Sequence, residues 1–440
     1  MTTGATTAPS GGLQRILGLG FGLAVIVGST LGIGILRTPG LVAGQLGTPS
    51  AILAVWVVGG LYTLLGSICL TELGIMLPAA GGYYVYARRA FGETVGFAVG
   101  WTDWLTYCAV LGYISIGLGE FAAVLFPGLV GMVKPIAVTA LIGFVVLQWA
   151  GVRISSRFQE AATAIKFAAF LALVVGCLVL AGRTAGAAPP ALAVGLTPTG
   201  LIIALQSVVI TYGGWQSALY FTEEDRDPRR NLPRAMIGGV LAVIGVYLLV
   251  NVALLGVLPI PELAKSTLPA ADAAQIVMGG RGRQFITILS LVSLAPLLNA
   301  ILMIGTRILY AMSRDGMLPA KAAVVNAGGT PTVATVVTTA VAMALIATGT
   351  FQKLVAVASF FLAVNYFVCC LALIVLRRRE PDAVRPFRAW GYPWSAGIVV
   401  VGAAAFLVGA LLADTPNALV ALVLLAVGLV GRKLRMSRSR

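Results

Sequence analysis

Two glycine-containing stretches inside apolar segments are the residues best suited to bind a small molecule. Residues 27–35 read VGSTLGIGI and residues 210–215 read ITYGGW. Each glycine costs about 1 kcal/mol relative to alanine in a helix interior, so both stretches are predicted to interrupt a helix. Tight packing of neighbouring helices is the alternative use of closely spaced glycines. Two interruptions in corresponding positions of two halves favour a binding site instead.

An interrupted helix has the chemistry to bind the part that all amino acids share. Free N–H groups at the start of one half-helix, with the positive end of its dipole, attract a carboxylate. Free carbonyls at the end of the other half accept hydrogen bonds from an ammonium group. We expect the amides of Ile33, Gly34 and Ile35 and the carbonyls near Val27, Thr30 and Ile210 to serve these roles. The predicted substrate-binding residues are Val27, Thr30, Ile33, Gly34, Ile35, Ile210, Gly213 and Trp215.

Charged residues inside apolar segments are costly and therefore need a function or a partner. Lys166 lies midway along an apolar run and is a candidate for proton exchange, with snorkelling as the alternative. Glu120 is the second candidate for coupling, and a position at the outer interface is its alternative. Glu72 fits a helix-end carboxylate at the inner interface, Asp103 is expected to pair with a cytoplasmic arginine, and Arg37 suits an outer vestibule.

Composition places these residues in a membrane protein. Of 440 residues, 59% are hydrophobic and 10% are charged, whereas soluble domains carry about 25% charged residues. Apolar runs of about 20 residues recur, and each is long enough to cross a bilayer as a helix. The runs do not alternate as barrel strands do. The twelve predicted spans are 13–44, 49–77, 93–127, 132–151, 157–181, 198–224, 233–258, 284–313, 331–350, 353–376, 393–412 and 415–431.

The distribution of lysine and arginine predicts the orientation. With twelve spans, 21 of these residues fall on the side of the termini and 6 on the other side. This bias predicts cytoplasmic termini and a multi-pass protein of the plasma (inner) membrane. The net charge of +15 therefore reflects orientation in lipid and not nucleic-acid binding. The mixed-sign run at 223–230 is either a solvated loop or an inner gate in which Glu223 or Glu224 pairs with basic residues.

The chain is unsuited to intramembrane enzyme chemistry. It has no histidine, and its five cysteines lie in apolar segments without the spacing of zinc ligands. We therefore expect no metal, no cofactor and no catalytic residue. A channel and a non-transporting sensor stay open as minor alternatives, because fold alone does not settle function. No cysteine falls in a predicted outer loop, so no obligatory partner subunit is expected.

Several motifs flank the two breaks or lie at the predicted cytoplasmic ends of spans. They are TELGIMLP at 71–78, GGYYVY at 81–86, YGGW at 212–215, TEE at 222–224, NLPRA at 231–235, RDGMLP at 314–319 and RPFRAWGYP at 385–393. Together they make the chain resemble the amino acid–polyamine–organocation (APC) superfamily of transporters along nearly its whole length.

The resemblance implies an all-α membrane fold of two inverted five-helix repeats, with helices 1 and 6 broken, plus two peripheral helices. The corresponding divisions are 1–12 (tail), 13–181 (first repeat), 198–376 (second repeat), 393–431 (peripheral helices) and 432–440 (basic tail). It also implies alternating access and makes Lys166 a substitute for a sodium ion beside helices 1 and 8. Ile210 stands where the family often has a gating aromatic residue, so Tyr212 or Trp215 is the alternative gate.

These features predict a sodium-independent amino acid transporter that works by proton-coupled symport or by exchange. The expected side-chain pocket is mostly apolar and has no acidic residue at the breaks, which favours neutral amino acids. A cationic amino acid or polyamine antiporter is the alternative. The pocket is expected to contain Thr30, Leu111, Tyr113, Ser293 and Phe360, together with Ile33, Ile210 and Trp215.

Overall fold

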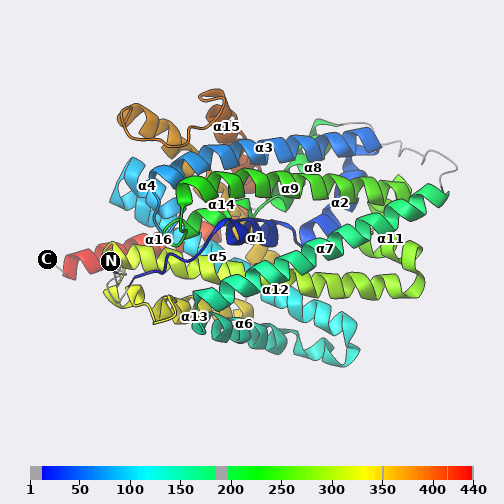
Figure 1. Ribbon diagram of the computed structural model, residues 1–440, viewed down its shortest axis with the longest axis horizontal. Helices are drawn as coiled ribbons and strands as arrows, with labels where there is room; N and C mark the ends of the chain where they lie inside the picture. The colour runs from blue at the N-terminus through cyan, green and yellow to red at the C-terminus, as the bar shows by residue number, and fades with distance from the viewer. Residues whose placement is uncertain (1–11, 185–196, 349–350, 414, 439–440) are drawn as a thin grey trace, which may run out of the picture.

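The computed structural model describes residues 12–184, 197–348, 351–413 and 415–438. Over these ranges the chain forms helices, turns and two isolated β-bridges, with no strand. Most of the long helices run along the long axis of the molecule (Figure 1). The all-α fold class predicted from composition is therefore confirmed.

Every predicted span corresponds to a helix or to a broken helix. Within the described ranges, seven helices are long and apolar enough to span a membrane by themselves, and a pair bent by 44° makes an eighth. The elements at the predicted spans are α1 (Leu19–Thr30) with α2 (Ile33–Leu46), α3 (Pro49–Met76), α5 (Glu93–Leu125), α6 (Val133–Trp149), α7 (Val152–Thr184), α8 (Pro198–Thr211) with η2 (Trp215–Phe221), α9 (Pro228–Val257), α12 (Gly282–Arg314), α13 (Thr332–Thr348), α14 (Phe351–Arg379), α15 (Trp394–Ala413) and α16 (Thr415–Arg438).

Short helices in the connecting segments were not predicted. Each is too short to show the apolar run by which a span is recognised. The segments α10 and α11 pack against α2 and α12 at the end of the molecule away from the described chain ends. The short elements are α4 (Tyr83–Phe91), α10 (Ile260–Lys265), α11 (Pro269–Met278), η1 (Pro127–Met132), η3 (Gly279–Arg281) and η4 (Ala320–Ala323).

The first helix begins later than predicted. The sequence predicted a span from residue 13, but α1 starts at Leu19, and residues 12–18, here termed the strap, are not helical and form one isolated bridge at Leu17. The Leu17 N–H donates to the Glu224 carbonyl, and the Arg226 N–H donates to the Leu17 carbonyl, both at 3.0 Å. Pairing with the loop at 224–226 satisfies the Leu17 N–H and carbonyl groups, which would otherwise take part in helix hydrogen bonds.

The core forms where α1 is surrounded by long helices. Helix α1 packs against α7, α9, α12 and η2. Helix α5 packs against α12, α14, α6 and α4. Large apolar side chains such as Val146 and Ile165, both 61% exposed, line the outside of α6 and α7. That exposure suits lipid contact and is expected of a multi-pass membrane protein.

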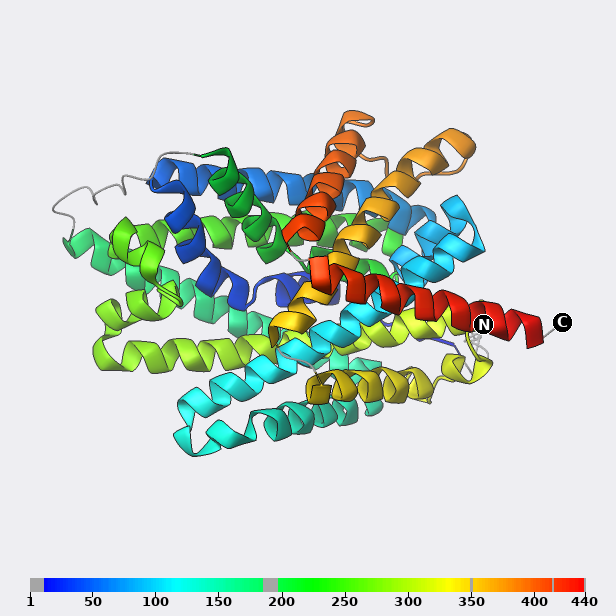
Figure 2. The same cartoon turned by 180° about the vertical axis from the view of Figure 1, so that it is seen from behind.

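Both chain ends of the described structure lie at one end of the molecule. Figures 1 and 2 place the strap and the C-terminal end of α16 there, with α15 and α16 at the periphery of the bundle. The exact divisions of the repeats stay predictions, and residues 185–196, between the two predicted repeats, lie outside the described residues.

Candidate functional site

The break in helix 1 lies where the glycines predicted it. Helix α1 ends at Thr30, Gly32 is extended with φ −137° and ψ −161°, and α2 begins at Ile33. No side chain of the described residues caps the N-terminus of α2. Its first amides, those of Ile33, Gly34 and Ile35, therefore keep the donor capacity and the dipole that suit a carboxylate. Ile33 and Gly34 are partly exposed.

The break in helix 6 touches the break in helix 1. Helix α8 ends at Thr211, a turn follows, and the chain continues as the 3-10 helix η2 from Trp215. Gly214 has φ +116°, and a Cβ at this position would lie 2.5 Å from the carbonyl oxygen of Ser29. Only glycine accommodates both the backbone angle and the approach. The two predicted breaks therefore form one site.

One tyrosine hydroxyl joins the carbonyl ends of the two broken helices. Tyr247 of α9 has its Oη 2.6 Å from the Thr30 carbonyl and 2.9 Å from the Thr211 carbonyl. Because a hydroxyl has one proton, it donates to one of these carbonyls at a time. Thr38 and Thr211 add a hydroxyl pair at 2.8 Å between α2 and α8. Tyr247 lies within a continuous apolar helix, so no feature of the sequence marked it as part of the site.

The carbonyls predicted to bind an ammonium group already have intramolecular partners. The Val27 carbonyl accepts from the Leu31 N–H at 2.9 Å, and the Ile210 carbonyl accepts from the Gly213 N–H at 2.9 Å. A carbonyl oxygen has a second lone pair, so one further hydrogen bond is available at each. The hydroxyls of Ser29 and Thr30 are buried and have no partner among the described residues.

The predicted aromatic and apolar residues at the second break differ in exposure. Ile210 is 49% exposed, whereas Trp215 is 7% exposed. The Trp215 ring packs edge-on against Tyr366 of α14, with centroids 5.6 Å apart. Gly213 is partly exposed. The structure thus brings Ile210, Gly213 and Trp215 to the break, and their roles toward substrate stay predictions.

Lys166 is enclosed between the first and eighth spans. Its Nζ donates to the Gly28 carbonyl of α1 at 2.9 Å and to the Ser293 carbonyl of α12 at 3.0 Å. The side chain is fully buried, and in the described part of the chain it forms no ion pair. One turn earlier in α7, Thr163 donates to the Ala24 carbonyl at 3.1 Å. The snorkelling alternative does not fit this enclosure.

Glu120, the other predicted coupling residue, is in a different environment. It is an exposed residue in the last two turns of α5, and its coupling role stays a prediction. Arg37 is also exposed and lies over the Phe121 ring at 5.8 Å. The structure therefore does not bring Glu120 together with Lys166 into one enclosed cluster.

Ion pairs close the end of the molecule that carries the strap. Glu224 binds Arg307 of α12 through two hydrogen bonds of 2.9 and 3.0 Å, with both side chains buried. Glu223 pairs with Arg314 at 2.7 Å and accepts from the Ala80 N–H at 2.8 Å. The pairing predicted for an inner gate is present.

A further pair on this side involves Asp315. Arg88 of α4 pairs with Asp315 at 2.7 Å. Tyr84, outside the membrane-spanning helices, also donates to Asp315 at 3.1 Å. Burial, reinforced by the Asp315 carboxylate, raises the pKa of the Tyr84 phenol well above its ordinary value. The phenol therefore acts only as a neutral donor at physiological pH.

Two carboxylates inside helices have partners that the sequence did not reveal. Glu72 is fully buried and binds Arg377, Arg385 and the Ala389 N–H. Asp103 was expected to pair with an arginine, but its partner is the hydroxyl of Tyr220 at 2.8 Å. The expectation failed because the inward face of α5 at this depth meets the tyrosines of η2 and α4.

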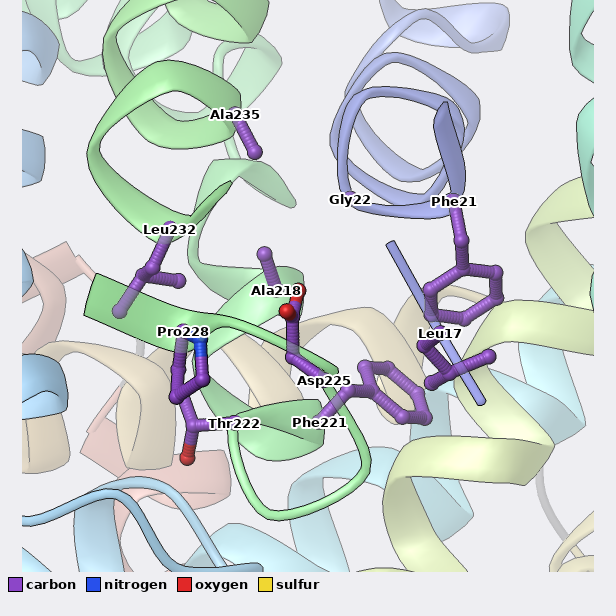
Figure 3. Close-up of a pocket in the computed structure, with 10 residues that line it drawn as sticks. All are labelled: Leu17, Phe21, Gly22, Ala218, Phe221, Thr222, Asp225, Pro228, Leu232 and Ala235. Carbon is purple, nitrogen blue, oxygen red and sulfur yellow. The ribbon is translucent and has the colours of Figure 1, made fainter. Parts of the chain in front are cut away.

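A small apolar pocket lies beneath the strap and away from the two breaks. Figure 3 shows Leu17 of the strap and Phe21 of α1 facing Leu232 of α9, with Asp225 among the lining residues.

All five cysteines are buried and free. In the described ranges no group of three histidine, cysteine or acidic side chains is placed to hold a metal ion.

A bundle of apolar helices in which two broken helices meet at a shared central site defines a helical membrane transporter fold. The structure is similar to that of MhsT in complex with L-phenylalanine, with a TM-score of 0.64, 15% identity, and coverage of 92% of this chain and 99% of that one. At that identity the likeness shows the fold alone.

The sequence comparisons identify the family. The amino acid permease family model matches residues 22–429, so the chain belongs to the amino acid permease family. It is 28% identical to the serine/threonine exchanger SteT of Bacillus subtilis, over 92% of this chain and 93% of that protein. It is 30% identical to the Asc-type amino acid transporter 1 of Mus musculus, over 86% and 73% of the two chains. The large neutral amino acids transporter small subunit 2 of Oryctolagus cuniculus is 30% identical over 87% and 74%.

Proposed function

We propose that this protein is a sodium-independent transporter of neutral amino acids that works by alternating access. The observation that carries the proposal is the uncapped N-terminus of α2 facing the carbonyl ends of α1 and α8. Amide donors on one side and carbonyl acceptors on the other match the carboxylate and the ammonium group of an α-amino acid. Relatives whose names specify serine and threonine or neutral amino acids support this substrate class.

The absence of an acidic side chain at the breaks supports neutral over cationic substrates. The residues proposed to face substrate are Ile33, Gly34, Ile210, Gly213 and Trp215, none of which is charged. A cationic side chain placed here would lose its hydration without gaining a carboxylate. Polyamines and cationic amino acids are therefore expected to compete weakly.

Lys166 supports independence from sodium. Its ammonium group contacts the Gly28 carbonyl of helix 1 and the Ser293 carbonyl of helix 8. A fixed cation bound to backbone carbonyls there does what a bound sodium ion would do, which is to hold the two helices together. Proton-coupled symport and exchange are both compatible with this arrangement.

Location and assembly are part of the same proposal. The lysine and arginine bias of 21 to 6 supports a cytoplasmic location of the strap and of the end of α16, in a plasma (inner) membrane. We infer that the protein works without a partner subunit, because its five cysteines are buried inside helices. Copurification of a second chain in stoichiometric amount from native membranes would contradict this.

Uptake by purified protein in liposomes tests the function. Labelled serine, alanine and leucine are offered without sodium, first with an inward proton gradient and then with unlabelled amino acid inside. Accumulation driven by the gradient shows symport, and uptake only into preloaded vesicles shows exchange. Lys166→Met is expected to abolish both without changing how the protein elutes in size-exclusion chromatography. Uptake that requires sodium in the unmodified protein, or no flux across the panel, would overturn the proposal.

A further inference from the structure

Asp103 is a buried carboxylate that the proposed transport cycle leaves unexplained. It lies on α5 with no exposed surface. Its Oδ2 accepts a hydrogen bond from the Tyr220 hydroxyl at 2.8 Å, and its Oδ1 has no partner among the described residues. Among the described residues, no lysine or arginine forms an ion pair with Asp103.

The other fully buried carboxylates show what Asp103 lacks. Glu224 has Arg307 as a bidentate partner, and Glu72 is bound by two arginines. An ionised carboxylate that is buried without a cation is strongly destabilised. Asp103 thus differs from Glu72 and Glu224 in having a surrounding that suits a neutral carboxyl group.

The ionisable groups that interact with Asp103 carry no positive charge. They come from α5 itself and from three neighbouring elements, and are Tyr83 of α4, Tyr107 of α5, Tyr220 of η2 and Cys369 of α14. The Tyr220 ring packs against Tyr107 and Tyr83 at centroid distances of 5.4 and 5.8 Å. The enclosing tyrosines are at most 3% exposed.

The ligand that fits this enclosure is a proton. A metal cation needs several oxygen ligands, whereas Asp103 offers two oxygens and one already accepts from Tyr220. In the described ranges no group of three potential ligand side chains surrounds it. From this geometry we propose that Asp103 is a proton-binding site whose occupancy is coupled to the position of η2. The inference rests on the proposed transport function and adds a coupling residue to it.

Tyr220 provides the coupling. It lies on η2, the inner half of helix 6, three residues before Glu223 and four before Glu224. A displacement of η2 that separates Glu224 from Arg307 also withdraws the Tyr220 hydroxyl from Asp103. The carboxyl group then meets water on the inner side. Its O–H bond breaks, the proton passes to a water molecule, and the negative carboxylate is left hydrated. When the carboxylate takes up a proton again, Asp103 becomes neutral and can return to its buried position beside Tyr220.

The test replaces the carboxyl group with a neutral isostere. Asp103→Asn and unmodified protein are reconstituted with a pH-sensitive dye inside the vesicles, and labelled serine uptake and internal pH are measured together. We expect Asp103→Asn to retain serine exchange at equal internal and external pH. Its gradient-driven accumulation is expected to fall to the equilibrium level, with loss of substrate-dependent acidification. Glu93→Gln removes an exposed carboxylate from the same helix and is the matched control, expected to behave as unmodified protein.

Tyr220→Phe keeps the carboxyl group and removes only its hydrogen bond, so it keeps the proposal testable if Asp103→Asn does not fold. Proton coupling is expected to persist with a shifted pH of half-maximal uptake, which a purely structural role would not produce. Unchanged acidification by Asp103→Asn, or loss of coupling in Glu120→Gln alone, would overturn the assignment. Exchange without proton movement in unmodified protein would overturn the inference and leave the transport function standing, whereas absence of all flux would overturn the function itself.

Discussion

In each of the two broken helices, the half nearer the strap is held in place by different interactions. The carbonyls of α1 accept hydrogen bonds from Thr163 and Lys166 of α7 and from Tyr247 of α9. In contrast, η2 leads directly into Glu223 and Glu224, which pair with arginines of α12. A net hydrogen bond contributes about 1 kcal/mol, or about 1.5–3 kcal/mol when one partner is charged, as Lys166 is. Loss of one partner of a buried ion pair costs more, about 3–5 kcal/mol, because it leaves the other charge buried and unpaired.

This difference indicates an order of release. Water can take over the carbonyl contacts of α1 one at a time, while the Glu224–Arg307 pair separates as a unit. We therefore expect α1 to move at lower free-energy cost than η2 when the end of the molecule that carries the strap opens.

Glu224→Gln is expected to have the largest effect. It leaves the Arg307 guanidinium, 1% exposed, without its carboxylate, and loss of one partner of a buried pair costs about 3–5 kcal/mol. Thermal unfolding of the purified protein in detergent measures this loss. A variant as stable as the unmodified protein would show that the pair does not hold η2, and the comparison would fail.

Alanine substitution at one glycine of each break sharpens the comparison. At Gly214 a Cβ meets the Ser29 carbonyl oxygen at 2.5 Å on a backbone with φ +116°, so Gly214→Ala is expected to cost about 2–4 kcal/mol and to abolish uptake. Gly32→Ala is the control, since its Cβ would meet nothing nearer than 3.9 Å and its extended backbone accepts any residue. Equal losses of uptake in the two variants would contradict the contact between the breaks.

Tyr247→Phe should weaken the link between the carbonyl ends of α1 and α8. The hydroxyl is buried and contacts both Thr30 and Thr211, so its removal is expected to cost about 1 kcal/mol of stability. Equilibrium binding of labelled serine and thermal unfolding are both measured on this variant. Together they distinguish a loss of site geometry from a loss of stability. Unchanged values in both measurements would remove Tyr247 from the site.

Glu223→Gln is expected to have the smallest effect on stability. Its pair with Arg314 is partly exposed, at 26% and 35% for the two side chains, and such pairs contribute under about 1 kcal/mol. Comparing the two glutamine variants thus distinguishes the stability contributed by the buried Glu224–Arg307 pair from that contributed by the partly exposed Glu223–Arg314 pair. A loss as large as that of Glu224→Gln would show that exposure does not distinguish them.

The sequence predicted the elements of this fold better than the contacts between them. Apolar runs are local properties, so the twelve spans and the breaks at Gly32 and Gly214 followed from composition and glycine position. Lys166 was found because a cation in an apolar run is conspicuous by itself. The exception was the strap, where residues 13–18 extend an apolar pattern but bond to a loop distant in sequence.

Residues that act through tertiary partners could not be predicted. Tyr247 lies in an apolar helix and shows no local sign that its hydroxyl reaches two carbonyls. Asp103 was expected to pair with a cytoplasmic arginine, but its partner is the hydroxyl of Tyr220 on η2. Which face of a helix meets which neighbour depends on packing across the whole bundle.

The strap also has a consequence for biosynthesis. Arg15 donates to the Asp225 carbonyl, 210 positions later in the chain, and Leu17 bonds to the adjacent Glu224 and Arg226. At typical elongation rates the ribosome needs about 10–40 s to add that length of chain. During this interval the strap and α1 have been synthesised, but residues 224–226, to which the strap bonds, have not. The amino-terminal segment is therefore exposed to chaperones and proteases until the first half of the chain has been synthesised.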